Sequence, residues 1–141
     1  MPPELAEIRR WIEKAEHDLQ TAELAMRSRR AITDIASFHC QQAVEKLLKA
    51  YLVSKEQDFE KIHDLRALTL ACSDCDSAFK ELLPRVGPLT AYAVRYRYPG
   101  PNDPTVEEVN EAIEVVGDVW AFVLDRLPHE VRPSGGPSHG P

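Results

Sequence analysis

The chain has 141 residues, of which 43% are hydrophobic and 28% charged, and its formal net charge is -6. This length and balance are typical of one globular domain. The negative charge excludes a protein that binds nucleic acid through an overall basic surface, but it leaves a local basic patch open. No apolar run reaches the roughly 18 residues of a membrane helix, and the first residues show no signal-peptide pattern. Three cysteines, an odd number, do not form a disulfide framework, so we expect a location in the reducing cytoplasm. Because an apolar run of sufficient length is lacking, we expect no membrane contact.

Two long helices are expected in the first part of the chain, because neither proline nor glycine occurs between Glu4 and Leu83. From Leu5 to Met26, apolar residues recur in alternating steps of three and four, which predicts one apolar stripe on a helix. The opposite side, which includes Asp18, is expected to lie in solvent. Residues 33–53 carry apolar groups on more than half of the circumference, which is typical of a central helix.

Shorter helices and one last long helix are expected in the rest of the chain. Three shorter pieces are predicted at about residues 63–73, 76–83 and 87–98. The last helix begins at Thr105, which forms a capping box with Glu108. The fold class is therefore all-α, an antiparallel up-and-down helical bundle of about five helices over residues 1–127. Residues 128–141 are expected to form a disordered tail rich in proline and glycine.

The net charge is concentrated in the last helix. Residues 103–127 hold seven acids and one base, whereas residues 1–102 hold 15 acids and 15 bases. By contrast, residues 84–102 hold three bases and no acid. This acid-free segment is therefore the candidate for a local basic patch.

Arginines and tyrosines alternate in the acid-free segment from Tyr92 to Pro99. Arginine forks bind phosphates through paired hydrogen bonds, and tyrosine rings offer faces on which bases stack. We take Arg95, Arg97 and Tyr98 as candidate phosphate- or nucleotide-binding residues. The alternative is that the two arginines pair with the acidic last helix and the tyrosines pack in the core.

Polar residues interrupt the otherwise apolar helix at 33–53. His39, Gln42 and Lys46 fall on neighbouring turns of that helix. They form either a stripe that faces a ligand or a partly exposed helix start with hydrogen-bonded amides. The sequence leaves both interpretations open.

Two other short motifs are better explained by structure than by chemistry. Asp64 after His63 is expected to cap a helix, although a His–Asp pair is also the minimal unit for proton transfer. Cys72 and Cys75 have the spacing of a metal-binding pair but lack a matching second pair. We therefore expect no metal and no cofactor, and a helix end with one buried thiol.

Four segments, taken together, resemble the HEPN domain family (higher eukaryotes and prokaryotes nucleotide-binding). They are Trp11–Leu19, Phe38–Ala50, His63–Leu65 and Arg95–Gly100, in that order, within residues 4–127. The resemblance implies a bundle like the C-terminal domain of kanamycin nucleotidyltransferase and a homodimer with the arginine-bearing helix near the dimer cleft. It also implies a minimal nucleotidyltransferase as partner, in a toxin–antitoxin-like pair.

Many members of that family are metal-independent ribonucleases, whose signature is an arginine followed a few residues later by a histidine. Here Asn102 stands five residues after Arg97, and no histidine occurs between His63 and His129. Asparagine can hydrogen-bond a phosphate but cannot move a proton near neutral pH. The candidate catalytic residues are Arg97, Asn102 and His63. Because Asn102 stands where the family's signature has its histidine, the general base of the signature is missing.

The resemblance and the residues together predict a nucleotide- or RNA-binding component. Its phosphate contacts are expected from two groups of side chains, namely Arg95, Arg97, Tyr98 and Asn102, and His39, Gln42 and Lys46. The alternatives are a metal-independent endoribonuclease with a non-canonical base and a purely structural helical assembly subunit.

Overall fold

A computed structural model describes residues 1–59, 62, 64–95 and 103–133, with the side chains of residues 94 and 95 outside the description. The α-helices are α1 (Pro3–Arg27), α2 (Thr33–Ser54), α3 (Leu65–Cys75), α4 (Leu83–Val86), α5 (Tyr92–Arg95) and α6 (Val106–Leu124). Three 3-10 helices accompany them: η1 (Ser77–Leu82), η2 (Gly87–Leu89) and η3 (His129–Val131). The described residues contain no strand, and the predicted all-α helical bundle is confirmed.

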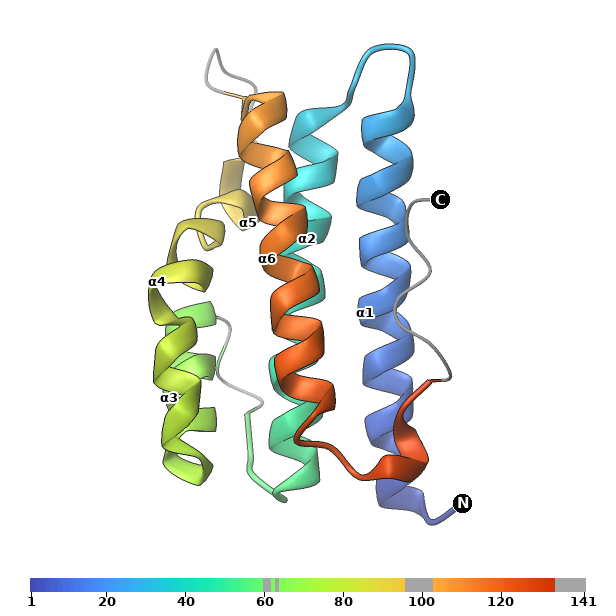
Figure 1. The fold of residues 1–141 in the computed structure, drawn as a ribbon, viewed down its shortest axis with the longest axis vertical. Coiled ribbons are helices and arrows are strands. Elements are labelled where there is room, and N and C mark those ends of the chain that lie inside the picture. Colours follow the sequence, from blue (N-terminus) through green and yellow to red (C-terminus); the bar gives the residue numbers. More distant parts are fainter. Residues whose placement is uncertain (60–61, 63, 96–102, 134–141) are drawn as a thin grey trace.

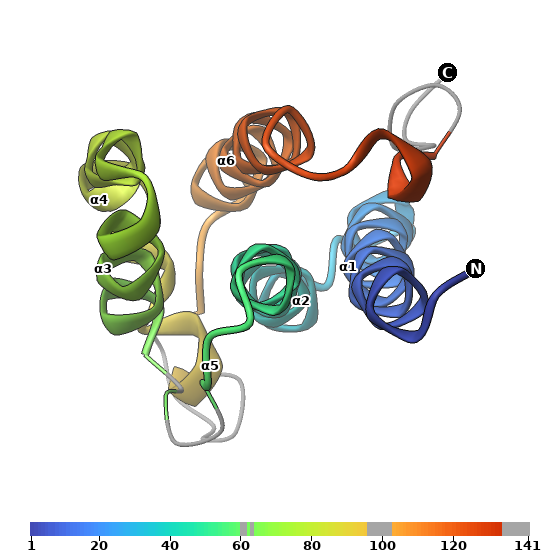
Figure 2. The ribbon, with the colours of Figure 1, turned by 90° about the horizontal axis from the view of Figure 1, so that it is seen from below.

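Helix α2 lies at the centre of the bundle, as its apolar circumference predicts. It contacts α1, α3, α5 and α6, and Figure 2 shows it surrounded by these elements. Helices α1 and α2 are antiparallel, whereas α2 and α6 run in the same direction (Figure 1). The shared direction arises because the short helices α3 to α5 return the chain to the end of the bundle where α2 begins.

The long helices pack through the stripes that their spacing predicts. On α1 the buried stripe includes Ile8, Ile12, Ala15, Leu19 and Ala22. On α2 the buried side chains lie on nearly every side, and many of the α2 positions are fully covered. Burial of one such leucine or isoleucine stabilises the fold by roughly 1.5 to 3 kcal/mol. The α1–α2 pair is therefore a well-packed part of the bundle.

The segment between α3 and α5 is more broken than the sequence predicts. Prolines and a glycine at Pro84, Gly87 and Pro88 divide it into short α and 3-10 turns, because proline lacks the N–H of a continuing helix. Phe79 anchors the segment. Its buried ring lies 4.4 Å from the ring of Tyr51 and 4.9 Å from that of Phe122, measured between centroids.

Asp76 fastens the start of η1 to the end of α6. Its carboxylate accepts a hydrogen bond from the backbone N–H of Ala78 at 3.0 Å and another from Nε of Arg126 at 2.8 Å. These two donors, the Ala78 N–H first, hold the pKa of the Asp76 carboxyl below its usual value. The guanidinium of Arg126 also lies over the ring of Phe122, at 3.6 Å from its centroid.

The capping box predicted at the start of α6 is confirmed. The Thr105 hydroxyl accepts from the Glu108 backbone N–H at 3.1 Å, and the Glu108 carboxylate accepts from the Thr105 backbone N–H at 3.0 Å. Two otherwise unpaired backbone donors are thereby satisfied. The cap fixes the start of α6 at Val106.

Thr105→Ala is expected to lower the free energy of unfolding by about 1 kcal/mol, because the Glu108 N–H loses its acceptor. Urea unfolding followed by circular dichroism measures the change. Thr105→Ser keeps the hydroxyl and should differ little from the wild type. Equal losses in the two variants would mean that the hydrogen bond is not what stabilises this helix end.

After α6 the chain turns back onto α1. The turn η3 contacts α1 and buries Val131. The Arg132 guanidinium donates to the backbone carbonyls of Asp125 and Leu127, at 3.0 to 3.2 Å. The rest of the predicted tail, residues 134–141, lies outside the described residues. Among the helices described, none combines the length and the apolar character that crossing a membrane requires.

Candidate functional site

Asp18 is the buried acid of the α1–α2 pair, although the sequence places it on the solvated side of its helix. Only 7% of the residue is exposed. It lies between Ala15 and Ala22, in steps of three and four, at the edge of the buried stripe. The prediction for Asp18 is therefore wrong. A carboxylate that is this well buried needs partners, because leaving it unpaired would be costly.

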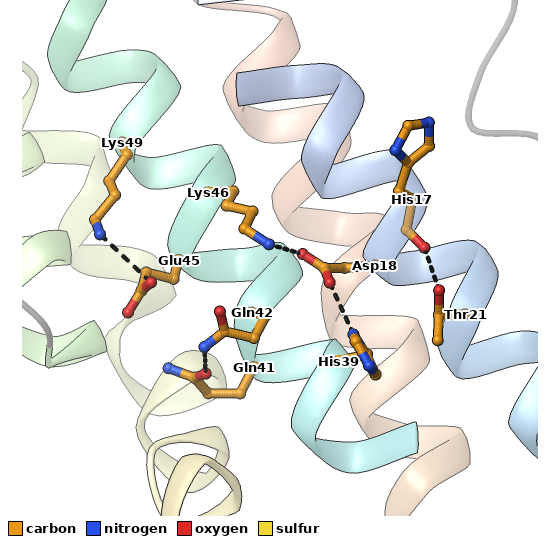
Figure 3. A network of polar contacts seen from close by, with 9 residues as sticks. All are labelled: His17, Asp18, Thr21, His39, Gln41, Gln42, Glu45, Lys46 and Lys49. Atoms are coloured by element: carbon orange, nitrogen blue, oxygen red, sulfur yellow. Dashed lines mark hydrogen bonds and ion pairs between the residues drawn. The ribbon is translucent and has the colours of Figure 1, made fainter. Parts of the chain in front are cut away.

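The partners of Asp18 come from α2 and are two of the predicted site residues. Nδ1 of His39 lies 2.8 Å from Oδ1 of Asp18, and Nζ of Lys46 donates to the other carboxylate oxygen. Figure 3 shows Asp18 directed towards α2, with His39 and Lys46 reaching it from two levels of that helix. Since an ionised carboxylate only accepts, Nδ1 carries the proton and Nε2 is left for another partner.

The exposure of the three side chains differs in a useful way. The side chain of Asp18 alone is 9% exposed, whereas that of His39 is 26% and that of Lys46 is 22% exposed. The acid thus lies underneath, and the two nitrogen groups lie between it and solvent. Because Asp18 fixes both, a ligand that binds them loses less side-chain entropy than it would with free side chains.

Gln42 completes this group on the intervening turn of α2. Its amide donates to Oε1 of the buried Gln41 at 2.7 Å (Figure 3). We call the set His39, Gln42 and Lys46 the α2 polar face. The hydrogen-bonded amide and the partial exposure agree with the structural interpretation of these residues, whereas a stripe that faces a ligand remains a prediction.

Lys49, one turn beyond Lys46, is held differently. Its ammonium lies 5.6 Å from the ring centroids of both Trp11 and Phe59, and it donates to Glu45 at 3.4 Å. The residue is 9% exposed. Lys49 therefore closes the end of the α2 polar face by packing, and Lys46 is the lysine open to a ligand.

The surroundings of the α2 polar face are set by α1 and α5. Viewed along the bundle, these helices lie on either side of α2, and α6 covers the other side (Figure 2). Helix α5 contacts α2 and ends at Arg95. The predicted arginine–tyrosine segment therefore leaves the described structure from a helix beside α2.

The other predicted site residues cannot be placed in the same way. Arg97, Tyr98, Asn102 and His63 lie outside the described residues, and only the backbone of Arg95 is described. Of the seven predicted phosphate-binding residues, the structure thus brings together His39 and Lys46 through Asp18, with Gln42 between them.

Two residues of the acid-free segment, residues 84–102, make contacts within the fold. Arg85 forms an ion pair with Asp118 of the acidic last helix, with Nη2 and Oδ2 separated by 2.7 Å. Tyr92 is 6% exposed, so its ring packs in the core and offers no stacking face. The alternative that the tyrosines pack in the core therefore holds for Tyr92, whereas the pairing of Arg95 and Arg97 with the last helix concerns side chains outside the description.

Nucleophilic chemistry by Cys40 is disfavoured, although this cysteine follows His39 directly. Burial raises the pKa of the Cys40 thiol to about 12, and the nearby carboxylates of Glu23 and Asp18 act in the same direction. The group remains a thiol near neutral pH, and a thiol is a poor nucleophile. The side chains of this site can thus donate hydrogen bonds, attract an anion through the Lys46 ammonium, and transfer a proton at His39.

The two short motifs have the structural roles that the sequence favours. The Asp64 carboxylate caps α3 by accepting from the Arg66 N–H at 2.7 Å. Cys72 is buried near the end of α3, and Cys75 is exposed. Within the described part of the chain, no three His, Cys, Asp or Glu residues are grouped so that they could hold a metal ion.

Comparison with known proteins gives one match. The family model described as HEPN domain matches residues 8–127. No curated protein and no solved structure matches the chain. The matched range includes most of α1, all of α2 and α6, and the whole α2 polar face.

Proposed function

The chain belongs to the HEPN domain family, and from this premise we propose that it is a nucleotide- or RNA-binding component that holds phosphate on the α2 polar face. The observation that carries the proposal is the pairing of His39 and Lys46 with a buried Asp18. Imidazole N–H and ammonium groups are both phosphate donors. When His39 is protonated, the three groups together carry a single positive charge, which favours an anion.

The arginine–tyrosine segment is the second part of the proposed site. Arg95, Arg97, Tyr98 and Asn102 would add guanidinium, ring and amide contacts to the ligand. Support comes from the course of the backbone, because α5, which forms the first part of this segment and ends at Arg95, contacts α2. By the family resemblance, the protein would act as a homodimer together with a minimal nucleotidyltransferase.

The proposal is tested by the double variant His39→Ala/Lys46→Ala. Each charge-assisted hydrogen bond that is removed is worth roughly 1.5 to 3 kcal/mol, so we expect binding of ATP, GTP or short RNA to fall by at least about tenfold. Isothermal titration calorimetry measures the affinity. Arg97→Ala should weaken the same ligand if the segment contributes.

A matched control is His17→Ala/Lys80→Ala, which removes the same two residue types from exposed positions away from the α2 polar face. His17 points away from Asp18 in Figure 3. This control should bind as the wild type does. Equal affinity in all three proteins, or no binding by the wild type, would refute the proposed function.

One observation favours ribonuclease activity as the second candidate. A carboxylate that fixes an imidazole through Nδ1 is the arrangement that prepares Nε2 for proton transfer. In this role His39, rather than His63, would replace the histidine that the family's signature requires. RNA fragments that appear with the wild type and not with His39→Ala would support this activity, and intact RNA with both would exclude it.

A further inference from the structure

The turn between α1 and α2 carries a cluster of arginines that the candidate site does not include. Arg27 lies in the last turn of α1, and Arg29 and Arg30 follow it, all three exposed. No acidic residue occurs from Leu24 to Thr33. We call these three residues the arginine turn.

Among the described residues, the arginine turn lacks the carboxylate partners that two other arginines have. Arg85 and Arg126 each pair with a carboxylate. Within the described residues, neither Arg29 nor Arg30 forms an ion pair. Like charges this close together repel one another, and a bound polyanion would relieve that repulsion.

The arginine turn lies at one end of the helix that carries the α2 polar face. It joins the two helices that hold Asp18, His39 and Lys46, at the end of the bundle where α2 begins (Figure 1). At a rise of about 1.5 Å per residue, the start of α2 is about 9 Å from the level of His39 and about 20 Å from that of Lys46. One phosphate group cannot contact both the start of α2 and Lys46 across this distance, whereas the repeated phosphates of an RNA strand can.

We propose that the arginine turn is a second phosphate-binding site, which together with the α2 polar face holds one single-stranded RNA along α2. This inference rests on the proposed function and extends it from a single phosphate to a strand. The arginine turn is flanked by two exposed apolar side chains, Leu24 and Ile32, which are 63% and 44% exposed. They offer apolar contacts to the unpaired bases of a single strand.

The test compares Arg29→Ala/Arg30→Ala with His39→Ala/Lys46→Ala. Fluorescence anisotropy measures the binding of labelled RNA of about four and about twelve nucleotides, over a range of salt concentrations. The matched control Arg9→Ala/Arg10→Ala removes the same charge from exposed positions at the other end of α1. Circular dichroism checks that all variants remain helical.

For Arg29→Ala/Arg30→Ala we expect about tenfold or weaker binding of the longer RNA and a change of less than about twofold for the shorter RNA. The slope of log affinity against log salt should fall by about 0.7 for each phosphate that the variant no longer binds. His39→Ala/Lys46→Ala should weaken both RNAs, and the Arg9→Ala/Arg10→Ala control should bind both as the wild type does.

Other outcomes separate this inference from the function on which it rests. If the arginine-turn variant matches its control while His39→Ala/Lys46→Ala loses binding, the second site is refuted and the proposed function stands. If only the arginine-turn variant loses binding, both the shared strand and the proposed α2 site are refuted. If that variant halves the mass in solution without affecting RNA, the turn is a protein interface and the inference is overturned.

Discussion

Asp18→Ala is expected to lower the free energy of unfolding by about 2 kcal/mol. The variant leaves the His39 Nδ1–H and the Lys46 ammonium without the acceptor that they share. Both groups are partly exposed, so water replaces part of the missing interaction and the cost stays below that of a fully buried ion pair. Urea unfolding measures the change.

A second measurement separates the role of Asp18 from a general loss of stability. In the wild type the Nδ1 proton of His39 should give an NMR signal that exchanges slowly with water, and Asp18→Ala should remove this signal. Glu13→Ala deletes an exposed carboxylate from the same helix and should leave both the stability and the signal unchanged. A stable Asp18→Ala protein that keeps the signal would refute the contact.

Phe79→Ala is expected to cost about 3 to 5 kcal/mol, the largest loss of any change considered. The ring is fully buried between Tyr51 of α2 and Phe122 of α6, so its removal leaves a cavity where η1 meets both helices. Thermal and urea unfolding give the magnitude. Phe79→Leu fills most of the space and should lose less than about 1.5 kcal/mol.

The part of the fold that Phe79→Ala destabilises most is also predicted. Hydrogen exchange in the Phe79→Ala protein should increase most in η1 and α4, because Phe79 anchors this segment, and least in α1 and the centre of α2. A loss below about 1 kcal/mol, or exchange that rises equally throughout, would show that the ring does not hold the segment to the bundle.

The helical architecture could be predicted because the long helices are strongly periodic. The steps of three and four between Ile8 and Ala22 allow one buried face and no other. The capping box at Thr105 was equally predictable, since its two hydrogen bonds depend only on residues three positions apart. Such features depend on residues that are close in the sequence, so the sequence alone is enough to predict them.

The segment around Phe79 was less predictable because its form is decided by packing. Apolar residues at 76–83 and 87–98 suggest regular helices, but Pro84 and Pro88 cannot continue them and the 3-10 turns follow. Burial of Tyr92 is a similar case. Its alternation with arginine suggests an exposed ring, and only the tertiary packing of the bundle shows that it is buried.

The burial of Asp18 could not be predicted from the sequence of its own helix. Charge placed it in solvent, but its partners lie 21 and 28 residues further along the chain, on another helix. A usable signal was present in its steps of three from Ala15 and four to Ala22, together with the histidine and lysine two turns apart on the central helix. The burial of the acid can be predicted only when the two basic groups on the facing helix are identified as its partners.

The acidic last helix has a definite role where it is described. Asp118 pairs with Arg85, so part of the negative charge of α6 is matched by a base of the α4 region on the exposed surface. The arginine turn lies on a different pair of helices and, within the described residues, takes no part in such pairing. Net charge therefore says little about the surface that a ligand meets.

The placement of Asp18, His39 and Lys46 within a single helical hairpin also bears on how the protein folds. The hairpin ends at Ser54, and a turn of only a few residues joins its helices, so closing it costs little chain entropy. Contacts that are local in sequence form early, and synthesis delivers the N-terminal part first. The polar face can thus assemble on the nascent chain before α6 has been made, and α6 then locks in place a face that already exists.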